Sequence, residues 1–273
     1  LIDGVPCQQV LEEVHFDWEV RDLSKETDHK DQCDELIRAF VNRPFNLATV
    51  PLLRTMLIEL DNGRAVFAVN MHHIISDGWS SGILTRELAT VYQQLLDGQQ
   101  PSLPALPIQY KDYADWQRDF LSGDRLEEAI SHWKTHLEGY EDLILPTDFA
   151  RPAELSGEGR SVYQKLAPEI HQQLSEFSKS RGISDFAVLL SGVYTILHAY
   201  SRQESINVGI PMANRDQQNV GDLVGFFINT VVNRIAIDGQ QTFGTLVAAV
   251  AAELIRGQEN QQVPFEKIVE AIN

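Results

Sequence analysis

The sequence predicts an α/β protein built from two lobes. In both halves of the chain, stretches with helical periodicity alternate with short apolar stretches rich in β-branched residues, a pattern typical of helices packed on sheets. With 273 residues, 43% of them hydrophobic, the chain can bury one large core or two smaller ones. Residues 146–159 are rich in Pro, Gly and polar residues. We therefore expect a first lobe at 1–145, a crossover at 146–159 and a second lobe at 160–273.

In the first half, we expect strands of a sheet that are preceded by one helix and followed by further helices. Asn62-Gly63 separates two apolar stretches, and this dipeptide favours a tight hairpin between strands. A helix should follow and end at Gly98, since glycine commonly terminates helices. The elements expected here are a short strand at 5–11, a helix at 30–41, strands at 52–60 and 65–71, the helix to Gly98, and helices at 110–120 and 126–137. An aromatic stripe along 110–120 is typical of a packing face.

The second half should repeat the alternation of strands and helices. Pro168 fits the first turn of a helix that ends at Gly182, and Ser184 is a suitable cap for the next helix. That next helix, 186–200, is apolar on most sides, so we expect it to be buried between a sheet and other helices. The remaining expected elements are strands at 160–165, 206–210 and 228–237, and a helix at 243–255.

The most informative stretch runs from Met71 to Ser80, where a predicted strand leads into a turn and a helix. Neighbouring strand residues point to opposite faces, so only one of His72 and His73 should enter a given pocket. Ser76 or Asp77 should lie near the cap of the helix, and Asp77 is close enough in sequence to brace the loop. Gly78 would let backbone amides approach a ligand. A histidine pair alone is more typical of a core, but this whole pattern between strand and helix favours a catalytic site.

Composition excludes several classes of protein. A net charge of −17 argues against nucleic acid as a partner, because phosphates would be repelled. No segment approaches the apolar length of a membrane span, and the opening is not a signal peptide. Cys7 and Cys33, the two thiols, fit a reducing cytoplasm, and no Cys/His cluster predicts a metal site.

The stretch 72–78 resembles the active-site motif of the condensation domains of nonribosomal peptide synthetases, and its His-His-x-x-x-Asp-Gly core is shared with chloramphenicol acetyltransferase. Further stretches that resemble condensation domains are 110–117, 208–215, 223–230 and 263–266. The resemblance implies two chloramphenicol-acetyltransferase-like α/β-sandwich lobes in a V-shaped pseudo-dimer. It also implies a chain truncated at both ends, because the opening motifs and closing strands of the family have no counterpart here.

The resemblance further implies a reaction and its partners. One carrier domain would present an acyl or peptidyl thioester on phosphopantetheine, and a second would present an aminoacyl acceptor whose amine attacks it. No cofactor would be bound by the domain itself, and an adenylation domain would be a neighbour in the same synthetase. Residues 76–80 resemble the subtype that joins an L-configured donor to an L-configured acceptor.

By the same resemblance, His73 is the catalytic histidine, Asp77 and Gly78 belong to the catalytic motif, and His72 is scaffold. The expected substrate contacts are Trp79, Ser80, Asn229 and Thr230. The family arginine that pairs with the motif aspartate has no match before His15, so we expect Asp77 to lack that partner. Asn260-Gln261-Gln262 departs from the family's His-Gln-Asp, which puts any role of those side chains in doubt.

The role of His73 stays open at this point. An α-amine has a pKa of roughly 8, so part of it is neutral at physiological pH and can attack without a base. His73 would then either accept the proton late or orient and stabilise the charged nitrogen. Two alternatives to a peptide-forming domain are a catalytically silent docking module and a coenzyme A-dependent acyltransferase of the same superfamily. The intact motif disfavours the first, and the four additional stretches disfavour the second.

Overall fold

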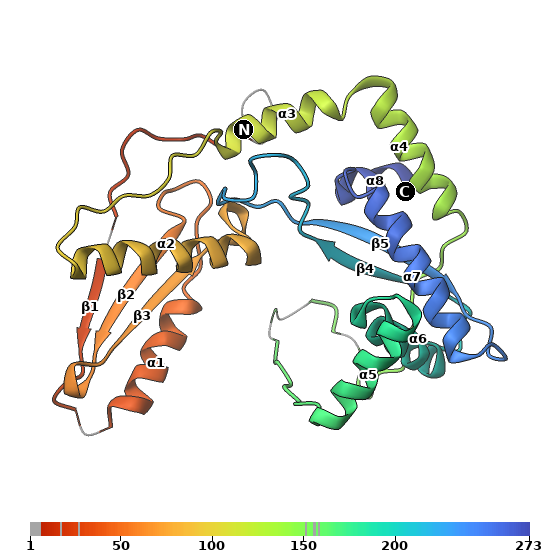
Figure 1. Ribbon diagram of the computed structural model, residues 1–273, viewed down its shortest axis with the longest axis horizontal. Helices are drawn as coiled ribbons and strands as arrows, with labels where there is room; N and C mark the ends of the chain where they lie inside the picture. The colour runs from red at the N-terminus through yellow and green to blue at the C-terminus, as the bar shows by residue number, and fades with distance from the viewer. Residues whose placement is uncertain (1–6, 17, 27, 151, 155–156, 158) are drawn as a thin grey trace. The chain divides into compact units, whose positions relative to one another are not determined.

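The computed structural model describes residues 7–16, 18–26, 28–150, 152–154, 157 and 159–273. The chain forms two compact units (Figure 1). The first unit comprises Leu1–Tyr110 and Gln217–Phe227, and the second comprises Lys111–Asp216 and Ile228–Asn273. The chain therefore passes from one unit to the other more than once.

A three-stranded sheet is the centre of the first unit (Figure 1). Strand β1 (Trp18–Asp22) pairs in parallel with β2 (Leu53–Glu59), and β2 pairs antiparallel with β3 (Ala65–Met71). The β2–β3 hairpin confirms the prediction. Its turn, η1 (Asp61–Gly63), places Asn62 and Gly63 at φ of 54° and 70°, a left-handed conformation that these two residue types favour.

Two helices complete this unit. Helix α1 (His29–Val41) packs against β3, and its Cys33 and Phe40 share a core with Met56 and Ile58 of β2. Helix α2 (Gly78–Leu96) follows β3 through the short 3-10 turn η2 (His73–Ile75). Both helices match the sequence prediction closely.

The N-terminal strand differs from the prediction. Residues 7–11 are irregular, whereas β1 lies further along, at Trp18–Asp22; positions 5 and 6 are outside the described residues. An edge strand forms because it pairs with its neighbour, here β2. The two strands are more than thirty residues apart, so the sequence around β1 does not show that it will pair.

The second unit contains a two-stranded antiparallel sheet, with helices that precede and follow its strands in the sequence. Its elements are α3 (Tyr110–Phe120), α4 (Gly123–His136), α5 (Pro168–Arg181), α6 (Asp185–Ser201), β4 (Ser205–Met212), β5 (Asn229–Ala236), α7 (Phe243–Glu259) and α8 (Phe265–Ile272). Pro168 begins α5, Gly182 at φ 65° ends it, and the Ser184 hydroxyl caps α6, as the sequence predicts.

The boundary between the units differs from the expected one. Trp133 and Leu137, at and just beyond the end of α4, are 2% and 4% exposed and pack with Val231, Val263 and Ile268. Residues 111–145 therefore belong to the second unit rather than to the first, because their apolar side chains complete its core. The expected crossover at 146–159 is irregular where it is described, and positions 151, 155, 156 and 158 lie outside the described residues.

Two further expectations for this unit are wrong. No strand forms at 160–165, a stretch that the structure describes throughout and in which Val162 and Tyr163 are more than 90% exposed. Helix α6 is not buried all round, since it buries one face, including Leu190 and Tyr194, against β4, β5 and α7. The other face exposes an apolar stripe of Phe186, Leu189, Val193, Ile196 and Tyr200.

No single helix among the described residues is long and apolar enough to cross a membrane; α5 and α6, bent by 108°, pass that test only as a pair, on length and composition.

Candidate functional site

The histidine motif lies in the first unit, where β3 ends and α2 begins (Figure 1). His72 caps the turn η2. Its Nδ1 accepts a hydrogen bond from the Ile74 N–H at 3.0 Å, and its own backbone N–H donates to Leu52 O at 3.0 Å. Its ring meets Phe45 edge-on, with centroids 6.0 Å apart. The fold thus uses this imidazole to hold the turn together.

His73 is placed differently. It is exposed at the first position of η2, and its ring stands at 89° to Phe226 with centroids 5.3 Å apart. The two imidazoles therefore occupy different environments. The cause is the turn rather than strand alternation, because β3 ends at Met71, before either histidine.

Asp77 caps α2 and is 2% exposed. One carboxylate oxygen, Oδ1, accepts hydrogen bonds from the N–H and the hydroxyl of Ser80, both at 2.7 Å, and Oδ2 accepts one from the Phe227 N–H at 3.2 Å. A buried carboxylate is costly unless such donors surround it. Donors within the first unit therefore surround this carboxylate, and the expectation that Asp77 lacks the arginine of the family stays a prediction.

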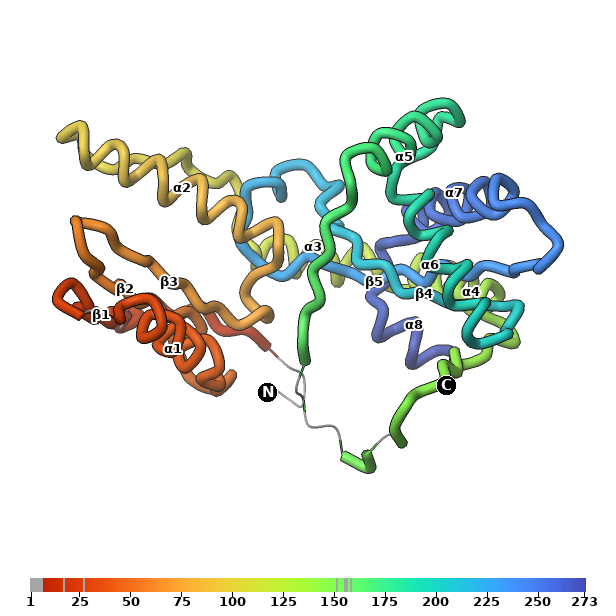
Figure 2. The backbone as a smooth tube through the Cα atoms, turned by 90° about the horizontal axis from the view of Figure 1, so that it is seen from below, coloured from red at the N-terminus to blue at the C-terminus, as the bar shows by residue number. Residues whose placement is uncertain are grey.

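The loop 217–227 lies beside the start of α2 (Figure 2). Ser80 and Trp79 hold it there through hydrogen bonds. Ser80 is 0% exposed; its Oγ lies 2.9 Å from Gly225 O and accepts from the Gly225 N–H at 3.1 Å. The Ser80 hydroxyl is enclosed by protein groups in this structure, and its expected contact with substrate stays a prediction. Trp79 is 54% exposed and donates from Nε1 to Gly221 O at 2.9 Å, so part of its ring faces solvent.

Gly78 is the first residue of α2 and is exposed. The N–H groups in the first turn of a helix have no acceptor within the helix, so this amide can serve a ligand. A Cβ built on Gly78 would meet no atom within 4 Å, which leaves open space beside the motif.

Asn229 and Thr230 belong to the second unit. The Asn229 side chain is 9% exposed, donates to Gln261 O and Val263 O at 2.6 Å each, and accepts from the Phe265 N–H at 3.0 Å. Its amide thus holds the segment that leads into α8, and the expected substrate contact of Asn229 stays a prediction. Thr230 is half-buried on β5, and its methyl group faces Gly209 of β4.

Sequence reasoning missed Phe226, the residue that contacts the His73 ring. The stretch 223–230 is notable in the sequence only for its resemblance to the family. The residues around Phe226 do not predict its contact with His73, because the two residues are far apart in the sequence and only the fold brings their rings together.

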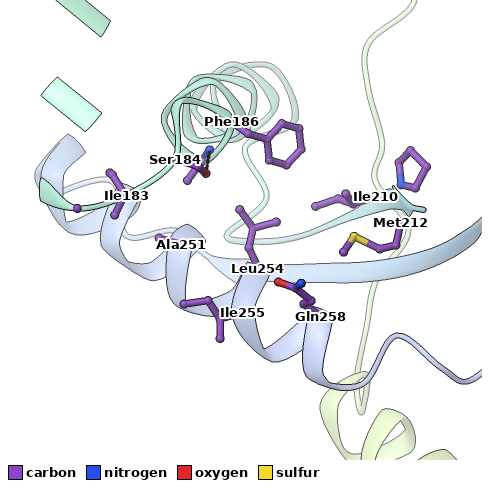
Figure 3. Close-up of a pocket in the computed structure, with 12 residues that line it drawn as sticks. Ile183, Ser184, Phe186, Ile210, Met212, Ala251, Leu254, Ile255 and Gln258 are labelled. Atoms are coloured by element: carbon purple, nitrogen blue, oxygen red, sulfur yellow. Dashed lines mark hydrogen bonds between the residues drawn. The ribbon is translucent and has the colours of Figure 1, made fainter. Parts of the chain in front are cut away.

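Two cavities are prominent among the described residues. In the first unit, a cavity of about 410 Å³ is lined by residues that include Ile74 and Ile75 of the motif, Tyr110 and Val224. In the second unit, a cavity of about 520 Å³ lies between α6, β4 and α7 (Figure 3). Phe186, Ile210, Met212 and Leu254 line it, and none of its described lining residues is ionisable, so it offers no acid or base. No group of three or more His, Cys, Asp or Glu among the described residues is arranged to hold a metal.

Known proteins are similar to this chain in sequence and in fold. The family model for the condensation domain matches residues 2–273. The chain is 40% identical to a linear gramicidin synthase from Brevibacillus parabrevis over 94% of its length, and 35% identical to bacitracin synthase 1 from Bacillus licheniformis over all of it. In both cases it spans 5% of the relative's length.

Solved structures agree. The X-domain from teicoplanin biosynthesis matches with a TM-score of 0.86 at 25% identity, over 97% of this chain and 59% of that one. A four-domain nonribosomal peptide synthetase bound to AMP and glycine matches with a TM-score of 0.81 at 25% identity, over 95% of this chain and 19% of that one. An epimerisation domain of tyrocidine synthetase, at 18% identity, shares the fold. On the family model and these relatives, the chain belongs to the condensation-domain family of nonribosomal peptide synthetases.

Proposed function

We propose that this chain forms peptide bonds between two carrier-bound substrates. The observation that carries the proposal is the contrast between the two histidines. His73 is exposed beside the start of α2, where Gly78 leaves open space, whereas His72 is bound into the turn. A catalytic group must be accessible and yet rigidly mounted, and the β2–β3 hairpin supplies the mounting.

The reaction would run as an acyl transfer. The acceptor amine attacks the carbonyl carbon of the donor thioester, forming the C–N bond and a tetrahedral species with a positive nitrogen and a negative oxygen. His73 accepts the proton from that nitrogen or stabilises its charge, and the Gly78 N–H at the positive end of α2 faces the negative oxygen. Collapse breaks the C–S bond and leaves the amide, and the departing thiolate takes up the proton that the nitrogen loses, either from His73 or directly from the nitrogen.

The substrates would arrive on phosphopantetheine arms of a donor and an acceptor carrier domain, with an adenylation domain in the same synthetase. Residues 76–80, Ser-Asp-Gly-Trp-Ser, resemble the subtype that joins an L-configured donor to an L-configured acceptor. The relatives are synthases of which this chain spans a small part, which fits one domain among many.

A single-turnover assay with two loaded carriers tests the proposal. We expect His73→Ala to slow amide formation by about 100-fold or more, the usual effect of losing a general acid–base group. His72→Asn is the matched control, because the asparagine Oδ1 takes the place of Nδ1 and can still accept from the Ile74 N–H, and it should lose less than about 10-fold, short of the loss expected for an acid–base group. Thermal melts must show both variants folded.

Other outcomes would favour other functions. Equal and small losses from both variants would remove His73 from the chemistry. Transfer from a coenzyme A thioester without any carrier would favour the acyltransferase alternative. If the folded protein transfers nothing from matched carriers, a docking role is the better explanation.

A further inference from the structure

The His73 ring touches a residue of the loop 217–227. Phe226 meets it edge-on, with centroids 5.3 Å apart and the ring planes at 89°. Edge-to-face pairs at this separation are a favoured and directional arrangement of aromatic rings. Because His73 is exposed, few other side chains can restrict its rotamer, so this contact has a large influence on where the imidazole points.

The main chain at Phe226 and on both sides of it is anchored by hydrogen bonds, and two of the side chains involved, Ser80 and Asp77, are buried. Gly225 exchanges two hydrogen bonds with the Ser80 hydroxyl, at 2.9 and 3.1 Å. The Phe227 N–H donates to Asp77 Oδ2 at 3.2 Å, and Phe226 O accepts from the Tyr110 hydroxyl at 2.7 Å. The backbone of three consecutive residues is therefore fixed, although the Phe226 side chain itself is 40% exposed.

The Ser80 hydroxyl links these anchors. It lies within donor distance of Asp77 Oδ1, at 2.7 Å, and of Gly225 O, at 2.9 Å, while it accepts from the Gly225 N–H. A hydroxyl has a single proton to share between the two oxygens, and its lone pairs accept the N–H. Ser80 is completely buried, so water cannot replace it in this network.

Gly225 is required for this approach. A Cβ at that position would lie 2.2 Å from Cδ2 of Tyr110, closer than real atoms pack. The loop thus supplies a glycine that permits close contact and a phenylalanine that reaches the histidine, and Ser80 of α2 holds the loop in place.

We propose that Phe226 is a positioning residue for His73, and that Ser80 sets the position of Phe226 through Gly225. The inference rests on the proposed function, since it assigns His73 the reacting position. In this proposal the Phe226 ring does not contact the reacting atoms of the substrates. It restricts the imidazole to the rotamer that the attacking amine meets.

The first test is kinetic. Phe226→Leu removes the ring but keeps an apolar side chain, and we expect kcat to fall by about 2- to 10-fold with KM for the acceptor carrier unchanged, the range expected from losing one aromatic pair. Phe226→Tyr keeps the ring and should restore kcat to nearly the parent value. Phe243→Leu is the control, because Phe243 is similarly exposed, at 44%, and also contacts an aromatic ring, but lies on α7 in the second unit.

The second test asks whether Ser80 acts through Phe226. Ser80→Ala should lower kcat on its own, and the double variant Ser80→Ala with Phe226→Leu should be no slower than the slower single variant. Independent losses that multiply would overturn the link between the two residues. A fall in melting temperature with unchanged kcat would show that Ser80 only stabilises the fold.

A spectroscopic test keeps this proposal separate from the proposed function. The imidazole proton resonances of His73, assigned with the His73→Ala variant, should shift in Phe226→Leu because the aromatic ring current is lost. That result is expected whether or not the protein forms peptide bonds. Unchanged resonances would overturn the positioning role, whereas shifted resonances in a protein that lacks transfer activity would count against the proposed function alone.

Discussion

His72 and His73 are adjacent in the sequence, yet different interactions decide what each can do. A nitrogen of His72 is occupied by a backbone N–H, and an imidazole that accepts there cannot also take a substrate proton at that atom. His73 leaves its ring at the surface, restrained by its aromatic contact with Phe226. The geometry of the turn therefore gives the two histidines different contacts and different accessibility.

Gly78 provides a residue-scale prediction. Its backbone is not left-handed and a Cβ would meet open space, so larger side chains are compatible with the fold. Gly78→Val should leave the free energy of unfolding within about 1 kcal/mol of the parent, as expected for a helix-end glycine replaced without strain. Amide formation should nevertheless fall by about 10-fold or more, because the valine would occupy the space proposed for the thioester carbonyl and displace the reacting atoms.

The measurement pairs a urea melt with the single-turnover assay. Gly82→Val, one turn further along α2 and also facing open space, is the matched control, and it should change neither quantity by a comparable amount. An unchanged rate in Gly78→Val would show that this glycine does not line the reacting position.

At the scale of elements, local patterns are sufficient wherever neighbouring residues determine the structure. The Asn62-Gly63 turn, the Asp77 cap of α2 and the Gly182 end of α5 follow from residue types at fixed positions, and the structure confirms all three. Strand β1 and the strand wrongly expected at 160–165 depend on distant partners, which a sequence window does not contain. The α6 error has a related cause, since composition does not tell which face of a helix finds a neighbour.

The same limit applies to the candidate site. The motif residues can be found in the sequence because they are contiguous, whereas Ser80, Asn229 and Phe226 can be understood only from their contacts. Ser80 and Asn229 have polar side chains that suggest substrate binding, but both are buried and bonded to main chain. Burial is a property of the folded chain, so their structural roles are not accessible from residue type.

A pH effect is expected where α4 meets α7. His136 Nε2 lies 2.8 Å from Glu253 Oε1 without hydrogen-bond alignment, and Glu253 also pairs with Arg256 at 2.6 Å. Burial lowers the pKa of His136 below its ordinary value; Glu253 opposes this, while His132, Arg256 and Arg234 add to it. The folded protein therefore favours neutral His136.

The sign of the effect follows from linkage. A histidine whose pKa is lowered by folding binds fewer protons in the folded state than in the unfolded state as pH falls below about 6.5. Its contribution to stability is present above that pH and is lost on acidification. Urea melts from slightly alkaline to mildly acidic pH should show the parent losing more stability than His136→Gln. A parallel decline in the two proteins would mean that carboxylates, not His136, set the acid sensitivity.

At the scale of the whole molecule, the path of the chain ties the motif to a distant segment. The loop 217–227 belongs to the first unit although the residues on both sides of it belong to the second. This loop closes over the start of α2 through the pairs Trp79–Gly221, Arg86–Asp222, Ser80–Gly225 and Asp77–Phe227. Two of these contacts involve fully or almost fully buried side chains, so the loop is part of the unit's interior.

This connectivity predicts that residues 1–110 alone fold poorly. Without the loop, the buried groups of Ser80 and Asp77 lose their contacts to Gly225 and Phe227, at a cost of about 1–3 kcal/mol for each buried group left unsatisfied. A polypeptide of residues 1–110 should therefore melt at lower temperature and exchange the amides of the first α2 turn rapidly. Joining residues 217–227 to it through a flexible linker should restore a cooperative melt and protect those amides.

The joined polypeptide also supplies the control. Ser80→Ala in that polypeptide should remove most of the protection gained from the loop, because the hydroxyl is the buried link to Gly225. Arg86→Ala should remove little, since Arg86 and Asp222 are 61% and 72% exposed and exposed ion pairs contribute less than about 1 kcal/mol. If residues 1–110 already melt cooperatively and protect the start of α2, the loop does not brace the motif, and the histidine turn is held by the hairpin and α2 cap alone.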